Sequence, residues 1–184
     1  MIKMGRTQMQ DAVPIRLGQE FKAYSVAVMR DIRRYGQGME EMCTLNMGGT
    51  AIGTGINADE AYLRRIVPNL AEVSNMEFVQ AFDLIDATQN LDGFVHTSAA
   101  LRVCAVNLSK ICNDLRLLSS GPKAGLGEIN LPPKQNGSSI MPGKINPVIP
   151  EVVSQVAYNV IGMTYRYYGC RGRTSWNLNG FEAW

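Results

Sequence analysis

The sequence predicts an all-α fold, an elongated bundle of long antiparallel helices, on three observations. From Val13 to Met42, apolar residues recur at steps of three and four, which is the spacing of one helix face. A second stripe, from Leu91 to Leu115, alternates strictly between these steps, so its helix should pack along a partner at a shallow angle. Helices of this length exceed the usual mean of about 11–12 residues, which favours an elongated bundle over a compact globule.

Local signals predict where the elements begin and end. Asp11 is the expected N-cap of the first helix, and Pro14 lies in its first turn, where a missing N–H costs little. Shorter helices are expected over residues 58–74 and 147–161. The glycine-rich stretch Met47–Gly55 (MGGTAIGTG) is interpreted as a tight connection between helices, because no strand precedes it and its G-x-G is a weak match to a phosphate loop.

The two stripes also predict which side chains are covered in a complete assembly. Apolar residues on the stripes should be buried, and charged residues off them should be more exposed. The apolar set is Leu17, Phe21, Val28, Leu101 and Leu108, and the charged pair is Arg33 and Lys110.

Composition narrows the class of protein. The chain has 184 residues, of which 46% are hydrophobic and 18% charged, with a formal net charge of +2. This length suits one domain with a sizeable core, and the charge balance argues against a nucleic-acid partner. No apolar run approaches the roughly 20 residues that span a bilayer, and no signal segment opens the chain. We therefore expect a cytoplasmic protein with no membrane contact.

The cysteines and the single histidine give no sign of a metal site. Cys43, Cys104, Cys112 and Cys170 are widely spaced without a C-x-x-C pair, so reduced thiols are expected. His96 is near no cysteine or carboxylate cluster in the sequence, and we interpret it as a residue on a helix face.

The most informative stretch is Gly137–Pro147, GSSIMPGKINP. It is a glycine-flanked loop that feeds into a helix and carries two hydroxyls, a lysine and an asparagine. Lys144 supplies a positive charge and Asn146 an amide donor, while Ser138 and Ser139 lie among small residues whose backbone N–H groups can face a ligand. The loop could clamp an anion beside a proton-transfer group. From the residues alone, a polar loop with a helix cap stays an equal alternative.

This loop resembles the signature loop of the class II fumarase/aspartase superfamily. Three further segments resemble that superfamily in the same order: Lys3–Phe21 (KMGRTQMQDAVPIRLGQEF), Thr50–Asn57 (TAIGTGIN) and Ser109–Pro132 (SKICNDLRLLSSGPKAGLGEINLP). The resemblance implies part of the central helical domain of the superfamily fold over residues 1–162, followed by a divergent tail over 163–184.

The resemblance also implies an activity, the β-elimination of ammonia from L-aspartate to give fumarate. Gln8 favours this aspartase branch, since the fumarases that resemble the chain have histidine there. Hydration of fumarate is the alternative within the enzyme class, and a catalytically silent, self-associating helical fragment is the alternative outside it. By position, Ser138 would be the general base, with Thr7, Gln8, Ser139, Met141, Lys144 and Asn146 binding the substrate. No cofactor and no metal are implied.

Two departures from the superfamily pattern affect the prediction. The resemblance implies a homotetramer in which three subunits build each site, and the N-terminal domain and two site segments are not matched by this chain. We therefore expect an incomplete site in these 184 residues. The second departure follows Gly162, where the sequence MTYRYYGCRGRTSW is poor helix chemistry. Similarity to the superfamily returns at Asn177–Glu182. Our hypothesis is therefore that residues 163–176 are a frame-displaced reading, which resequencing of the DNA would test.

Overall fold

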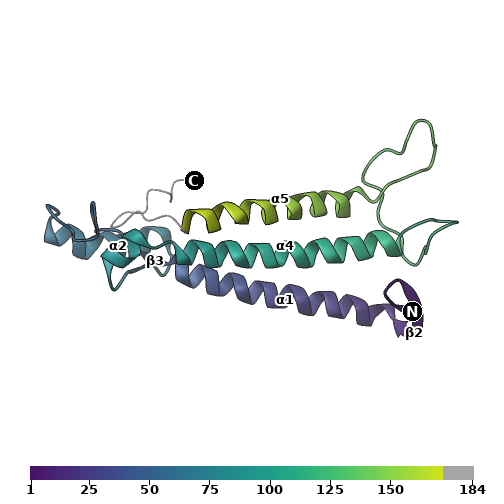
Figure 1. Cartoon of the computed structure of the whole chain (residues 1–184), viewed down its shortest axis with the longest axis horizontal. Helices are drawn as coiled ribbons and strands as arrows, with labels where there is room; N and C mark the ends of the chain where they lie inside the picture. Colours follow the sequence, from purple (N-terminus) through teal and green to yellow (C-terminus); the bar gives the residue numbers. More distant parts are fainter. Residues whose placement is uncertain (172–184) are drawn as a thin grey trace. The chain divides into compact units, whose positions relative to one another are not determined.

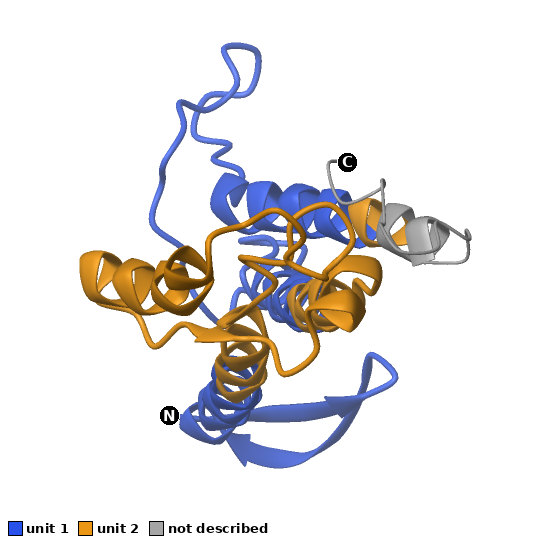
Figure 2. Ribbon diagram, turned by 90° about the vertical axis from the view of Figure 1, so that its left-hand side faces the viewer, with its two compact units in different colours: residues 1–32, 102–161 blue, residues 33–101, 162–184 orange. Residues whose placement is uncertain are grey.

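The computed structural model describes residues 1–171, and the side chains of residues 1–165. Its elements run in the order shown in Figure 1: β1 (Ile2–Thr7), β2 (Gln10–Arg16), α1 (Leu17–Met42), β3 (Thr44–Leu45), α2 (Glu60–Ser74), β4 (Val79–Gln80), α3 (Leu84–Gln89), α4 (Asp92–Leu118) and α5 (Val148–Arg171). Two compact units divide the chain (Figure 2). Unit 1 holds residues 1–32 and 102–161, and unit 2 holds residues 33–101 and 162–184.

Long helices dominate the described residues, so the predicted helical character of the chain is confirmed. Helices α1, α4 and α5 contain 26, 27 and 24 residues. None of the described helices is long and apolar enough to cross a membrane. The prediction of an all-α chain is wrong at the N-terminus, where the first sixteen residues form an antiparallel hairpin instead of entering the first helix.

The hairpin corrects the expected helix cap. Asp11 does not cap α1, because its carboxylate lies 3.2 Å from Arg6 Nε across the hairpin. Pro14 is in β2, paired with Met4, a position that proline tolerates in an edge strand. Helix α1 begins at Leu17, whose N–H donates to the Met1 carbonyl at 3.2 Å. The four-residue step from Val13 to Leu17 imitated a helical stripe, although Val13 belongs to the strand.

Within unit 1, polar contacts pair α1 with α4 in antiparallel order. The Tyr24 hydroxyl donates to Asp114 at 2.9 Å, and Asn107 Nδ2 donates to both Asp31 oxygens at 3.0 and 2.9 Å. Because the later residue on α1 meets the earlier one on α4, the helices run in opposite directions. Asp31 is only 1% exposed, so its carboxylate depends on such donors to offset the loss of water.

Most buried positions on the unit 1 parts of α4 and α5 are small residues, and several bulky apolar residues of these helices are exposed. The small buried residues are Ala105, Ser109, Cys112, Ser154 and Ala157, and Pro150 and Leu118 are buried with them.

The predicted burial of the two stripes does not hold in the single chain. Phe21, Val28, Leu101 and Leu108 are between 36% and 47% exposed, and Leu17 is half-buried. Arg33 and Lys110 are exposed, as predicted. The described helices are too few to cover all of their own apolar faces. Burial of these residues in a complete assembly stays a prediction.

Unit 2 contains the glycine-rich connection, and its tightness is confirmed. Gly53 has a φ of +89°, and a Cβ there would lie 2.4 Å from the Ile85 Cα, so only glycine fits. The connection leads into α2, whose start is fixed by Asp59, which accepts from the N–H groups of Ala61 and Tyr62 at 2.7 and 3.2 Å. This helix agrees with the predicted range 58–74. Strands β3 and β4 pair in parallel, which the sequence did not indicate.

The thiols and the histidine agree with the sequence interpretation where they can be described. Cys43, Cys104 and Cys112 are free thiols, and the Cys170 side chain lies outside the described part. In unit 2, His96 is on α4, is about half exposed, and has its Nδ1 2.6 Å from Glu41 Oε1.

The expected end of α5 is wrong. The predicted helix stops near Ile161, whereas α5 continues to Arg171, into the segment that we interpreted as a disrupted helix. Helix propensity is a weak prior, with a cost of at most about 1 kcal/mol for a glycine, which tertiary contacts routinely override. Thr164, beyond the predicted end, is 2% exposed. The predicted domain boundary at residue 163 is not tested, and Asn177–Glu182 lies outside the described residues.

Candidate active site

The loop between α4 and α5 is closed at its base by a glycine. Backbone atoms of Gly137 and Lys144 meet there, and a Cβ on Gly137 would lie 2.7 Å from the Lys144 carbonyl oxygen. Gly143, with a φ of +82°, supplies the left-handed turn just before Lys144. The Lys144 N–H donates to the Met141 carbonyl at 3.1 Å, and the loop reaches α5 at Val148. The glycines thus hold residues 138–143 as a compact turn in unit 1.

Ser138 is the residue at which this turn concentrates hydrogen-bond donors. Its Oγ accepts from the backbone N–H groups of Ile140 and Met141, at 3.2 and 3.3 Å. Two N–H dipoles aimed at one oxygen stabilise negative charge on it. The sequence predicted a loop rich in backbone donors, and the structure directs two of them to the predicted base.

The other predicted residues of this loop are free to meet a ligand. Ser139, Met141, Lys144 and Asn146 are exposed. In the part of the chain that the structure describes, the side chains of Ser139, Lys144 and Asn146 have no hydrogen bond or ion pair. An open cavity of about 650 Å³ next to the loop is lined by Gly137 and Ile145 together with residues 133–136.

Thr7 and Gln8 lie at the tip of the hairpin, in a strained turn. Thr7 pairs with Gln10, and the two residues between them, Gln8 and Met9, both have positive φ, 53° and 62°. Two-residue turns of this kind favour Asn-Gly, because the left-handed region costs other residues roughly 1–2 kcal/mol each. Gln8 and Met9 adopt these values without the asparagine or glycine that such turns favour.

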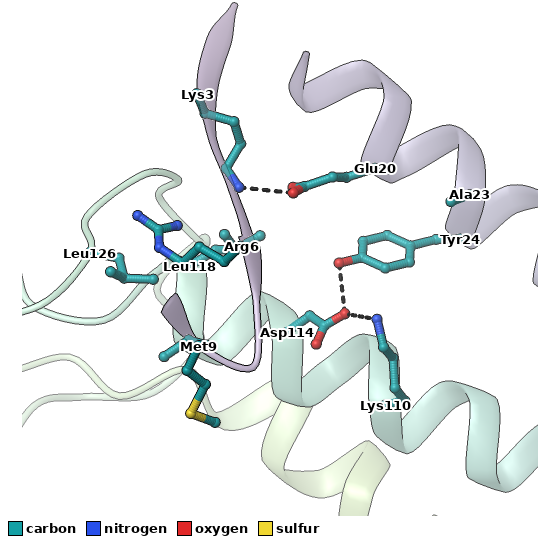
Figure 3. Close-up of a pocket in the computed structure, with 11 residues that line it drawn as sticks. Lys3, Arg6, Met9, Glu20, Ala23, Tyr24, Lys110, Asp114, Leu118 and Leu126 are labelled. Carbon is teal, nitrogen blue, oxygen red and sulfur yellow. Dashed lines mark hydrogen bonds and ion pairs between the residues drawn. The ribbon is translucent and has the colours of Figure 1, made fainter. Parts of the chain in front are cut away.

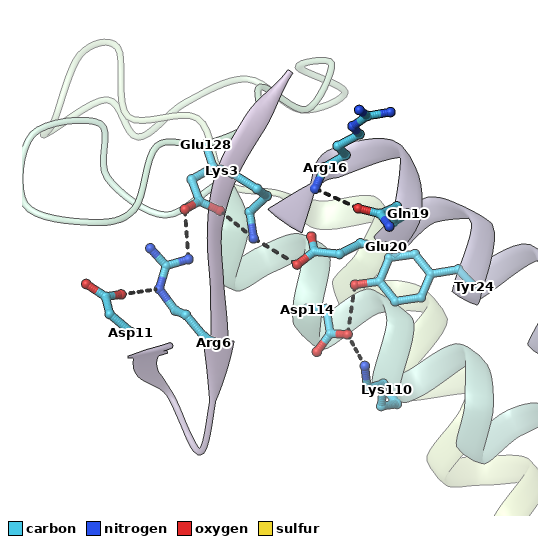
Figure 4. A network of polar contacts seen from close by, with 10 residues as sticks. All are labelled: Lys3, Arg6, Asp11, Arg16, Gln19, Glu20, Tyr24, Lys110, Asp114 and Glu128. Carbon is cyan, nitrogen blue, oxygen red and sulfur yellow. Dashed lines mark hydrogen bonds and ion pairs between the residues drawn. The ribbon is translucent and has the colours of Figure 1, made fainter. Parts of the chain in front are cut away.

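A network of ion pairs that the sequence did not predict holds the hairpin (Figure 4). Lys3 Nζ lies 2.9 Å from Glu20 Oε1 and 3.1 Å from Glu128 Oε2. Arg6 Nη1 lies 2.7 Å from Glu128 Oε1. Burial acts to lower the pKa of Lys3, but its hydrogen bonds to the two glutamates outweigh that effect and raise the pKa. The only available signal was that these residues lie within the segments that carry the resemblance.

A cavity of about 330 Å³ adjoins this network and is lined by residues from β1, α1, α4 and the segment after α4 (Figure 3). Lys3, Arg6 and Glu20 face it, and so does the Tyr24 hydroxyl, which is bonded to Asp114. Its charged groups are all in ion pairs, of which Lys3–Glu20 and Lys110–Asp114 lie within the lining, and its lining includes neither Thr7 nor Ser138.

Comparison with known proteins identifies the family. A family model described as "Lyase" matches residues 1–162. The chain belongs to this lyase family. Two curated relatives named aspartate ammonia-lyase, from Bacillus subtilis (strain 168) and Helicobacter pylori (strain ATCC 700392 / 26695), are 57% and 59% identical to it over 162 residues. Each match covers 88% of this chain, and the chain spans about a third of those relatives, 34% and 35%.

Solved structures agree with this assignment. The fumarate lyase:delta crystallin from Brucella melitensis, bound to cobalt, superposes with a TM-score of 0.92 at 51% identity, over 98% of this chain and 39% of that one. The class II fumarase from Schistosoma mansoni gives a TM-score of 0.92 at 32% identity, over 97% and 40%. The predicted membership of the fumarase/aspartase superfamily is therefore confirmed.

In this lyase chain the predicted site residues form two separate groups. Thr7 and Gln8 are at the hairpin tip, and the five others are in or beside the α4–α5 loop. Neither cavity described above is lined by a predicted site residue. Completion of the site by other segments, as the resemblance implies, stays a prediction.

The ion-pair network gives the lyase chain a testable dependence on pH. Burial acts to raise the pKa of Glu128, but hydrogen bonds from Arg6 and Lys3 outweigh it and hold the pKa below its ordinary value. A carboxyl with a lowered folded-state pKa stabilises the fold above its unfolded pKa, about 4.3, and this stabilisation is lost as pH falls through the folded value.

We therefore expect Glu128→Gln to lower the Tm of the chain at neutral pH. The difference in Tm between this variant and the unsubstituted chain should become smaller in acid. Thermal melts followed by circular dichroism, from about pH 7 down to about pH 3, measure this difference in Tm. A difference in Tm that stays constant over the whole range would contradict the expectation.

Proposed function

We propose that the complete protein containing this chain is an aspartate ammonia-lyase, which eliminates ammonia from L-aspartate to give fumarate, and that Ser138 is its general base. The observation that carries the proposal is the pair of backbone N–H groups directed at Ser138 Oγ. The names of the relatives, at 57% and 59% identity, support aspartate as the substrate.

The reaction needs charge stabilisation more than any other aid. Ser138, as the alkoxide, takes a proton from Cβ of L-aspartate, and the electron pair of that C–H bond moves into the adjacent carboxylate. The resulting dianionic carboxylate collapses, forming the double bond of fumarate and expelling the α-ammonium group as neutral ammonia. The proton on Ser138 is then released, so that the overall products are fumarate and ammonium.

Each loop residue has a role in this scheme. The N–H groups of Ile140 and Met141 stabilise the alkoxide, because preorganised dipoles act on the charge as it develops. Lys144 and Asn146, which have no partner in the described part of the chain, bind the substrate carboxylates together with Ser139, and Met141 lines the pocket. The substrate's own carboxylate accepts the electrons, so the scheme calls for no cofactor.

Hydration of fumarate is the second candidate, because the superposed Schistosoma mansoni protein is a fumarase. That relative is 32% identical to this chain, against 57% for the Bacillus subtilis aspartate ammonia-lyase. Gln8 also favours aspartate, since the resembling fumarases have histidine at that position. Release of fumarate from L-aspartate by the full-length lyase, followed by its absorbance, tests the proposal. Turnover of malate with none of aspartate would refute it.

We further propose that the complete enzyme is a cytoplasmic homotetramer in which partner subunits finish the site. The outward-facing Phe21, Val28, Leu101 and Leu108, each at least 36% exposed, support this assembly, because exposed apolar surface of this extent is costly in water.

The 184-residue chain by itself is expected to have no measurable aspartase activity, because it contributes only two groups of site residues. The isolated chain is thus expected to be the catalytically silent helical fragment, the alternative outside the enzyme class. The fumarate absorbance assay, run on the purified chain with the full-length lyase as the positive control, measures this. Clear turnover by the pure chain would mean that the unmatched segments are not required.

A further inference from the structure

The carboxylate of Glu128 is the point at which the ion pairs of the hairpin meet. One of its oxygens contacts Arg6 and the other contacts Lys3, so a single side chain joins two residues of β1. The side chains of Glu128, Arg6 and Lys3 are 13%, 20% and 3% exposed, so the ion pairs are shielded from water. Charge-assisted contacts with little solvent are stronger than those at an open surface.

Glu128 is itself fixed to the end of α4 by its backbone. Its N–H donates to the carbonyl of Leu118, a buried residue, at 2.9 Å. Just before it, the Gly127 N–H donates to the Ser120 carbonyl at 2.8 Å, and the Leu126 N–H donates to Ser120 Oγ at 3.1 Å. The backbone of Glu128 is therefore fixed to the end of α4, and its carboxylate holds β1 to that end.

The hairpin needs such an external support. Its turn is strained at Gln8 and Met9, and an isolated two-stranded hairpin is marginally stable in water. Apart from its own ladder, the side-chain ion pairs that tie β1 to the rest of unit 1 are those of Lys3 and Arg6, as far as the described residues show. Both side chains contact Glu128, and Lys3 also contacts Glu20 on α1.

We propose that Glu128 is a positioning residue for substrate binding. By clamping Lys3 and Arg6 against the end of α4, it sets the place of the hairpin tip, and with it Thr7 and Gln8. This inference rests on the proposed function of those two residues. The same segment continues, ten positions after Glu128, to Ser138, so the end of α4 serves as the reference for both groups of site residues.

The test is a double-mutant cycle in the full-length lyase, with Glu128→Gln, Gln8→Ala and the double variant. We expect Glu128→Gln to raise KM for aspartate about tenfold while changing kcat less than about threefold. Gln8→Ala should change KM and kcat in the same way. The rise in KM of the double variant should be well below the product of the two single rises, because both substitutions act through the hairpin tip. Glu128→Asp, which keeps the charge on a shorter arm, should give an intermediate KM.

Hydrogen exchange supplies a readout that does not depend on the substrate. Amides of residues 2–16 should exchange faster in Glu128→Gln, with α4 unchanged. Glu77→Gln is the matched control, because Glu77 is an exposed carboxylate with no ion pair in the described part of the chain. It should alter neither KM nor exchange.

Two results would overturn the clamp: unchanged exchange in the hairpin of Glu128→Gln, or KM effects that multiply in the double variant. If Glu128→Gln does not fold, the same cycle with Glu128→Asp decides on the same terms. Absence of fumarate production from aspartate by the unsubstituted enzyme would refute the proposed function instead. In that case the hairpin exchange still decides whether Glu128 holds β1.

Discussion

Replacing Ser138 by alanine in the full-length lyase is expected to lower kcat by at least about 100-fold, since a positioned general base contributes about 10²–10⁴. The reason is local. The Oγ atom that the N–H groups of Ile140 and Met141 polarise is removed, while the carboxylate-binding groups remain. KM for aspartate should therefore stay within about threefold of the unsubstituted value, because ground-state binding is not lost.

Steady-state kinetics of fumarate release measure both constants. Ser25→Ala is a suitable control, because Ser25 is an exposed serine on α1, outside the candidate site. A Ser138→Ala enzyme that keeps more than about a hundredth of kcat would mean that another group removes the proton.

Lys144→Ala should produce a different pattern, with KM raised about tenfold or more and kcat lowered as well. Lys144 is exposed, and its ammonium has no partner in the described part of the chain. Its charge is therefore available to a substrate carboxylate both in the ground state and in the dianionic intermediate, so its loss affects binding and turnover together.

Lys123→Ala is the matched control for Lys144→Ala. Lys123 is also exposed, and it lies in the same connection between α4 and α5 but outside the closed turn. It should behave like the unsubstituted enzyme. The assignment of a base and a binding cation would be dismissed if Ser138→Ala and Lys144→Ala both changed KM alone and by the same amount.

The helices could be predicted from the sequence because their signal is local. The stripe from Leu91 to Leu115 coincides with α4 from Asp92 onward, and the helix predicted over residues 58–74 agrees with α2. The hairpin could not be predicted, because Val13 and Leu17 have the spacing of a helix and Pro14 suits a first turn as well as an edge strand. Residues 10–16 form a strand because they pair with residues 2–7. The local sequence pattern contains no signal for that pairing.

The residues of the candidate site could be proposed from the sequence, but their geometry could not. Resemblance of the loop pointed to Ser138 and Lys144, whereas the two N–H groups that point at Ser138 depend on a turn closed by Gly137 and Gly143. Glu128 was missed for a different reason. It meets Arg6 across 122 positions of the chain, and a contact of that range leaves no periodic trace.

The central claim is that aspartate, and not malate, is the substrate of the complete lyase. It is tested most directly by giving the enzyme equal concentrations of L-aspartate and L-malate in one sample and following both, and the products, by proton NMR. Aspartate should disappear, with fumarate and ammonium formed in equal amounts, and malate should stay at its starting level. Loss of malate to fumarate while aspartate remains unchanged would contradict the claim and assign the site to fumarate hydration.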